Sequence, residues 1–174
     1  MPGHNREPTE VLIGLGGNLG DPESAFRRAL QRLSAEGSLV ISAASSLWRT
    51  PPWGMEDQPD YLNACARGTT ALSPQLLLQR LLAAEEAEGR IRGVRWGPRS
   101  VDLDLLFFGM RSIAEEGLTL PHPRIGERAF VLLPLAEIAP DWCYENETIE
   151  VLAARSDRTG LEIIASPADW WVSR

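Results

Sequence analysis

The sequence contains no lysine: all 17 basic residues among its 174 are arginines. This absence excludes two classes of enzyme. The phosphate-binding loop of P-loop nucleoside triphosphatases ends in Gly-Lys-Ser or Gly-Lys-Thr, and Schiff-base enzymes need a reactive lysine. The uniform use of arginine also suggests a coding bias, so the choice of arginine over lysine at any one position carries little information.

Cysteines and long apolar runs are also scarce. Cys65 and Cys143 are too few for a disulfide framework, so we expect a reducing compartment, the cytoplasm. No apolar stretch approaches the ~20 residues of a membrane span. The polar residues 1–10 do not resemble a secretory signal. These features predict a protein without membrane contact.

Positive charge is in deficit, with a formal net charge of −7 at pH 7. Nucleic-acid-binding proteins are usually basic, so we expect no nucleic-acid partner. An anionic ligand would need a local cluster of positive charge, and the arginine-bearing residues 90–99 are the best candidate. The length suits one domain over residues 1–174, with residues 1–8 as a polar tail. Nothing in the sequence demands more than a monomer.

Two aspartates follow the arginine segment in an apolar stretch predicted to be a strand, residues 101–108. Because side chains alternate along a strand, Asp102 and Asp104 should share one face, with Cα atoms about 6–7 Å apart. Carboxylates at this spacing can hold Mg²⁺, and arginine binds phosphate through a fork of donors. The combination indicates a nucleotide-handling site, although a solvated face is the alternative for either motif. The odd-numbered side chains are expected to face the core: Val101, Leu103, Leu105 and Phe107.

The first two thirds of the chain predict the order β-α-β-β-α-β. Strands are expected at residues 9–15, 39–48, 61–70 and 101–108, and helices begin at Asp21-Pro22 and Ser73-Pro74. Residues 14–20 are interpreted as a tight strand-to-helix turn, because Leu19 breaks the dinucleotide-binding glycine pattern. The order is typical of a ferredoxin-like α+β fold, whose antiparallel sheet carries two helices on one face and leaves the other for a site. The helical apolar stripes are Phe26, Ala29, Leu30 and Leu33, then Leu77, Leu81 and Ala84, before Gly89 as a helix-ending residue.

The last third of the chain gives weaker signals. A short pairing segment is expected at residues 112–119, a rigid turn at 121–123, and a helix over 130–139 interrupted near Pro134. Beyond these lie a helix near 149–154, a strand near 161–164, and the pair Trp170-Trp171, which is expected to pack or associate.

Residues 95–106, RWGPRSVDLDLL, resemble the most specific motif of the 6-hydroxymethyl-7,8-dihydropterin pyrophosphokinase family of folate biosynthesis. Four further segments support the resemblance: RTPP at 49–52, DQPDYLNA at 57–64, PHP at 121–123 and PLAEIAP at 134–140. The match runs in order from about residue 11 to 142, and residues 143–174 form an unmatched C-terminal extension. The chain departs from the family's Gly-Ser-Asn after the first strand, where it has Gly16-Gly17-Asn18.

The resemblance implies transfer of pyrophosphate from ATP to the hydroxymethyl group of a reduced pterin, with release of AMP. It implies two Mg²⁺ ions on Asp102 and Asp104, catalytic roles for Arg90 and Arg99, and an acid of unassigned role at Glu85. The residues implied around ATP are Arg92, Trp96, Arg99, Thr119, His122 and Arg128. Those implied around the pterin are Thr50, Pro51, Trp53, Tyr61, Asn63 and Phe130, with the Tyr61 and Phe130 rings on either side of it.

Two other functions compete with this one. Many ferredoxin-like domains have no catalytic activity, so a module that binds a small molecule or a partner is the first alternative. It predicts that Asp102 and Asp104 are dispensable. A dinucleotide-dependent oxidoreductase is disfavoured by Leu19 and by the predicted strand order.

Overall fold

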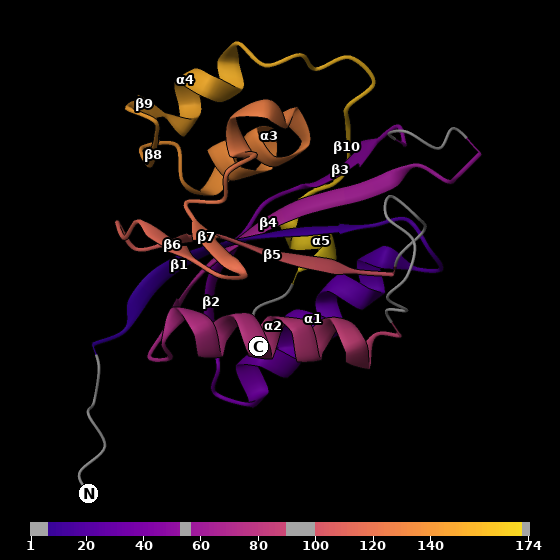
Figure 1. The fold of residues 1–174 in the computed structure, drawn as a ribbon. Coiled ribbons are helices and arrows are strands. Elements are labelled where there is room, and N and C mark those ends of the chain that lie inside the picture. Colours follow the sequence, from indigo (N-terminus) through magenta and orange to yellow (C-terminus); the bar gives the residue numbers. More distant parts are fainter. Residues whose placement is uncertain (1–6, 53–56, 90–99, 172–174) are drawn as a thin grey trace, which may run out of the picture.

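The helices of the computed structural model, which describes residues 7–52, 57–89 and 100–171, lie on both faces of an antiparallel sheet (Figure 1). None of the helices in these ranges is long and apolar enough to cross a bilayer. The strands are β1 (Thr9–Gly17), β2 (Val40–Ala44), β3 (Leu47–Thr50), β4 (Tyr61–Thr70), β5 (Asp102–Phe108), β6 (Ile113–Glu115), β7 (Leu118–Leu120), β8 (Cys143–Tyr144), β9 (Glu147–Thr148) and β10 (Glu162–Ala165). The helices are α1 (Pro22–Ala35), α2 (Pro74–Ala87), α3 (Ala129–Ile138), α4 (Ile149–Ala154) and α5 (Pro167–Trp170), with a 3₁₀ turn, η1 (Ile125–Glu127).

The main sheet has the strand order β10-β3-β4-β1-β5, and β2 pairs with another part of β4. Every pairing in it is antiparallel. The predicted order of elements from β1 to β5 is confirmed, except that the expected strand at 39–48 is divided into β2 and β3. Ser45 lies at the division, where its hydroxyl accepts a hydrogen bond from the Cys65 N–H at 2.9 Å. The hydroxyl thus satisfies a β4 donor where the ladder is broken.

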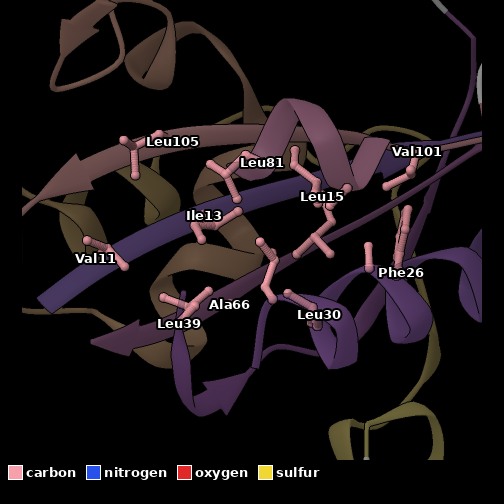
Figure 2. Packing of buried hydrophobic residues seen from close by; sticks show 14 of the residues in the cluster. Val11, Ile13, Leu15, Phe26, Leu30, Leu39, Ala66, Leu81, Val101 and Leu105 are labelled. Atoms are coloured by element: carbon pink, nitrogen blue, oxygen red, sulfur yellow. The ribbon is translucent and has the colours of Figure 1, made fainter. Parts of the chain in front are cut away.

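One face of the sheet packs on α1 and α2. Figure 2 shows side chains of β1, such as Ile13 and Leu15, meeting those of the two helices. The predicted stripes are confirmed, because Phe26, Leu30 and Leu81 are fully buried. Burying a side chain of this kind contributes about 1.5–3 kcal/mol each, so this layer fixes how the helices lie on the sheet.

The sequence predicts α3 and α4 as helices but leaves the opposite face free for a site, whereas in the structure these two helices cover part of that face. A second apolar cluster there joins Leu12 of β1, Leu106 of β5 and Leu132 of α3. The expectation that Phe107 faces the same core as Leu105 is wrong, because Phe107 belongs to this second cluster. The cause is an irregularity in the β1–β5 register: Ile13 pairs with Leu105 but Leu12 pairs with Phe107. The extra residue turns the following side chains to the other face.

Strand β1 is longer than predicted. It continues through Gly17, so Gly14 and Gly16 are strand residues and not part of a tight turn. Both pair with neighbours on each side, within β4 and within β5. The interpretation of residues 14–20 as a tight turn is therefore wrong for residues 14–17, where the glycines lie in a strand beneath a cavity. It holds for residues 18–20, which join β1 to α1 and include Gly20 with φ +68°.

The elements after β5 agree with the weaker predictions in outline. The pairing segment forms the hairpin β6–β7, and the predicted helix at 149–154 and strand near 161–164 correspond to α4 and β10. Helix α3 is not interrupted: Pro134 lies inside it. Trp170 packs within the chain, since its side chain is fully buried against Phe26.

The N-cap of α1 provides a prediction on stability. Asp21 accepts hydrogen bonds from the Ser24 N–H at 3.1 Å and from its hydroxyl at 2.6 Å, and these bonds hold the pKa of Asp21 below its usual value. Asp21→Ala should lower the free energy of unfolding by about 1 kcal/mol at pH 7. Because the pKa is lower in the folded state, this contribution is complete above the unfolded pKa of about 3.9 and is lost as the pH falls through the folded value. Urea unfolding at pH 7 and pH 3 measures the difference.

Ser73→Ala is the matched control for this prediction. Ser73 caps α2, accepting a hydrogen bond from the Leu76 N–H at 3.2 Å, and its hydroxyl does not titrate. Ser73→Ala should therefore lower the free energy of unfolding by a similar amount at both pH values. If Asp21→Ala lowered the free energy of unfolding equally at pH 7 and pH 3, a role for the charge of the Asp21 carboxylate would be contradicted.

Candidate functional site

A cavity of about 500 Å³ lies over the glycines of β1, on the face of the sheet that α3 partly covers. Nine of the predicted site residues line it: Thr50, Pro51, Tyr61, Asn63, Asp102, Asp104, His122, Arg128 and Phe130. Thr119 is exposed on β7 and Glu85 is buried on α2, and neither lines the cavity. Trp53, Arg90, Arg92, Trp96 and Arg99 lie outside the described residues.

The strand register shows that one end of this cavity lies over β4 and the other over β5. Gly16 pairs with Asn63 of β4 on one side and with Asp102 of β5 on the other. Gly14 likewise lies between Cys65 and Asp104. Neighbouring strands are about 4.8 Å apart, so Asn63 and Asp102 lie about 10 Å apart across a floor without side chains. A flat molecule at β4 and a phosphate at β5 can therefore meet over Gly16.

Asp102 and Asp104 share one face of β5, as the alternation predicted, and both are partly exposed to the cavity. Within the described ranges, no group of three or more His, Cys, Asp and Glu side chains is placed to hold a metal. Two carboxylates still fit Mg²⁺, because this ion is usually bound by one or two carboxylates together with water and substrate phosphates. The donor set suits a metal that arrives with a nucleotide.

Glu85 fixes the strand that carries these acids. Its side chain is 2% exposed, and its Oε1 accepts a hydrogen bond from the Leu103 N–H at 2.7 Å. Leu103 lies between Asp102 and Asp104, and β5 is the last strand of the main sheet on this side. The bond anchors the outer edge of β5 at the point where both carboxylates project. Glu85 thus holds the strand that carries the two acids in place without lining the cavity itself.

A histidine and two arginines add positive charge and donors beside the acids. Burial lowers the pKa of His122, against the charge of Asp104, and Arg128 and Arg124 lower it further. The His122 Nδ1 accepts a hydrogen bond from the Arg124 N–H at 3.3 Å. A neutral imidazole therefore carries its proton on Nε2, which can donate to a phosphate oxygen. Burial also lowers the pKa of Arg128, but arginine remains charged at neutral pH.

The other end of the cavity combines aromatic rings with a buried amide. The Asn63 Nδ2 donates to the Thr50 Oγ1 at 2.9 Å, and both side chains are buried. This bond fixes which way the amide points: a Cβ built on Gly16 would lie 3.1 Å from the Asn63 Oδ1. Phe130 and Tyr61 also line the cavity, and the Arg128 guanidinium lies 5.7 Å from the centre of the Phe130 ring. These groups suit a flat, hydrogen-bonding ring.

The sequence did not predict the cavity floor, nor the roles of Asn18, Arg124 and Glu127. Arg124 and Glu127 line the cavity and lie 3.8 Å apart as an ion pair. The Asn18 Nδ2 donates to the Gln58 Oε1 and to the Pro59 carbonyl, each at 3.1 Å, which ties the loop before β4 to the end of β1. The spacing of Gly14 and Gly16 was a usable signal for the floor, because glycines two apart lie on one face of a strand.

Comparisons with known proteins show which family the chain belongs to. The family model for 7,8-dihydro-6-hydroxymethylpterin-pyrophosphokinase matches residues 12–140. The chain is 44% identical over 154 residues to the 2-amino-4-hydroxy-6-hydroxymethyldihydropteridine pyrophosphokinase of Methylorubrum extorquens, covering 88% of this chain and 98% of that relative. It is 47% identical over 157 residues to the enzyme of that name from Synechocystis, covering 89% of this chain and 80% of that one.

A solved structure, wild-type HPPK-DHPS of Plasmodium falciparum, shares the fold with a TM-score of 0.68 at 16% identity. The match covers 88% of this chain and 42% of that longer chain. The family model spans most of the chain, and the match to the Methylorubrum extorquens relative covers nearly the whole of that relative. The chain therefore belongs to the 7,8-dihydro-6-hydroxymethylpterin-pyrophosphokinase family.

Proposed function

We propose that this protein transfers the pyrophosphoryl group of ATP to 6-hydroxymethyl-7,8-dihydropterin and releases AMP. The hydroxymethyl oxygen forms a bond to the β-phosphorus, and the bond between that phosphorus and the oxygen bridging to the α-phosphorus breaks. The hydroxyl loses its proton. The observation that carries this proposal is a single cavity with an aromatic and amide end on β3, β4 and α3, and a carboxylate end on β5.

The pterin is assigned to the end of the cavity at β4. Its ring would lie between Tyr61 and Phe130, and the Asn63 amide would read its hydrogen-bonding edge. Thr50 holds that amide, and Pro51 lies on the rim. Trp53, outside the described residues, is assigned to the same end by the family motif. An oriented amide costs little to align, so it favours a substrate with matching donors.

The nucleotide phosphates are assigned to the end at β5. Asp102 and Asp104 would hold two Mg²⁺ ions, which when bound neutralise charge on the phosphates. His122 and Arg128 would donate to the phosphates. Thr119, on β7 just before His122, is assigned to the nucleotide by the family resemblance. Glu85 acts as a positioning residue through the Leu103 N–H. Transfer of this type depends mostly on positioning and charge neutralisation, which these residues can supply.

Four further assignments follow from the family motif alone: Arg90 and Arg99 as catalytic residues, with Arg92 and Trp96 beside the nucleotide. They belong to the segment that joins α2 to β5, outside the described residues. Because β5 begins with Asp102, a segment that leads into it can deliver arginines to the same end of the cavity.

We also propose a ferredoxin-like α+β fold, one domain over residues 1–174, and a monomer that contacts neither nucleic acid nor membrane. The strand order β5-β1-β4-β3, with α1 and α2 on one face, supports the fold. Packing of residues 143–171 on both faces of the sheet supports the single domain. Cys65 and Cys143 form no disulfide, which supports a reducing compartment such as the cytoplasm.

The nucleotide released during turnover tests the proposed reaction. Incubation with ATP, Mg²⁺ and the reduced pterin should give AMP and pterin diphosphate in equal amounts, because the β-phosphorus is attacked. Chromatography with phosphorus NMR identifies both products. Release of ADP would mean simple phosphoryl transfer, and binding of the pterin without turnover would favour the non-catalytic binding module.

A further inference from the structure

The C-terminal strap, defined here as residues 157–171, lies beyond the part of the chain that the family model matches. It follows α4 on the α3 side of the sheet, passes the edge at β3, and ends with α5 on the α1 side (Figure 1). Its strand β10 pairs antiparallel with β3, so that β3, whose last residue is Thr50, becomes an inner strand of the sheet. The strap is therefore next to the pterin end of the cavity.

The strap touches the rim of the cavity at one close point. A Cβ built on Gly160 would lie 3.0 Å from the Pro51 Cγ and 3.3 Å from its Cδ, so the Gly160 backbone already lies against the Pro51 ring. Immediately after this point, Leu161 packs on the apolar cluster beneath α3, and Glu162 forms an ion pair with Arg49. Exposed ion pairs contribute little, so packing and strand pairing hold the strap to β3.

The far end of the strap is anchored in the core. Trp170 is fully buried, and its Nε1–H donates to the Ser45 carbonyl at 2.8 Å. Its own carbonyl accepts a hydrogen bond from the Arg27 Nε at 2.8 Å. Ser45 immediately precedes the segment that leads into β3. The strap thus restrains β3 at both of its ends, through Trp170 before it and Gly160 after it.

We infer that the C-terminal strap is a positioning element that holds Thr50 and Pro51 in place for the pterin. This inference rests on the proposed function. Thr50 holds the Asn63 amide through one hydrogen bond, and a shift of β3 relative to β4 would lengthen it. The acids lie on β5 and His122 follows β7, and neither of these strands pairs with β3. Loosening the strap should therefore weaken binding of the pterin and leave that of ATP unchanged.

Two glycine variants separate positioning from general stability. Gly160 and Gly37 both have positive φ, +77° and +68°, so alanine is strained at either position. At Gly37 an added Cβ meets nothing within 4 Å, whereas at Gly160 it would press on Pro51. Gly160→Ala should raise the Kd of the pterin about fivefold or more, because displaced binding groups are costly, while Gly37→Ala leaves it unchanged. Both should lower the melting temperature, because the strained backbone is common to the two variants.

The Kd is measured by calorimetry with α,β-methylene-ATP and Mg²⁺, because that analogue lacks the bridging oxygen of the bond that breaks. Equal pterin affinities for both variants, or a matching loss of nucleotide affinity, would overturn the inference. The double variant Gly160→Ala with Pro51→Ala should show no further loss beyond Pro51→Ala, because the contact has already been removed. Should Gly160→Ala not fold, Trp170→Phe, which removes the donor to Ser45 together with part of the buried ring, should raise the same Kd.

The proposed function can fail separately from this inference. AMP release by the wild-type protein tests the reaction, whereas the pterin Kd of the variants tests the strap without any turnover. A wild-type protein that binds the pterin but makes no AMP would contradict the first and leave the second measurable. One that does not bind the pterin would overturn both.

Discussion

Replacing either Asp102 or Asp104 with asparagine is expected to lower turnover by about 10³-fold or more while the protein stays folded. Both side chains are partly exposed to the cavity, so a change of similar shape leaves no void in the core. The apolar residues between and after them, Leu103 and Leu105, keep their place against α1 and α2. What is lost is the negative charge that holds Mg²⁺ against the nucleotide. Initial rates of AMP release, together with thermal melts, measure the two effects separately.

Asp141→Asn is the control for these variants. Asp141 is exposed in the turn after α3 and does not line the cavity, so its rate should equal that of the wild type. The rate of the Asp102 variant should also respond less to added Mg²⁺. Wild-type rates in both cavity variants would refute the metal assignment.

The acidic pair could be predicted from the sequence because it depends on a local rule. Alternation along a strand needs no knowledge of the partner strands, and Leu103 and Leu105 flank the acids with apolar side chains. The same rule fails two residues later at Phe107, where the register with β1 shifts. A bulge depends on the partner strand, so it left no signal in the residues of β5 themselves.

The partners of the cavity floor, and the pairing of the predicted strand near 161–164 with β3, could not be predicted for a related reason. Gly16 acquires its role from Asn63 and Asp102, which pair with it from positions 47 and 86 residues further along the chain. Strand β10 is short, and two of its residues, Ile163 and Ile164, are exposed despite being apolar. Its sequence therefore lacks the alternation of a half-buried strand, and it forms because β3 offers an edge.

Filling the glycine floor of the cavity at Gly16 is expected to have the second large effect, on pterin binding. Gly16→Val should weaken pterin binding by about 100-fold, because misplacing a substrate by even 1 Å is costly. The first added carbon already lies 3.1 Å from the Asn63 Oδ1, and the two methyl groups would occupy the space between Asn63 and Asp102. Valine suits a strand, so the melting temperature should hold or rise. Calorimetry with the pterin and α,β-methylene-ATP measures the loss.

Gly14→Ala is the matched control, since Gly14 lies in the same strand and on the same face as Gly16. A Cβ there would meet the Leu106 side chain at 3.5 Å, an ordinary contact that leaves the Asn63 amide untouched. Its pterin affinity should stay within about threefold of the wild type, since the core tolerates a small, unstrained addition. Gly16→Ala should fall between the two, because its single methyl crowds the amide without filling the floor. If all three variants bound the pterin equally, the two substrates could not be meeting above Gly16.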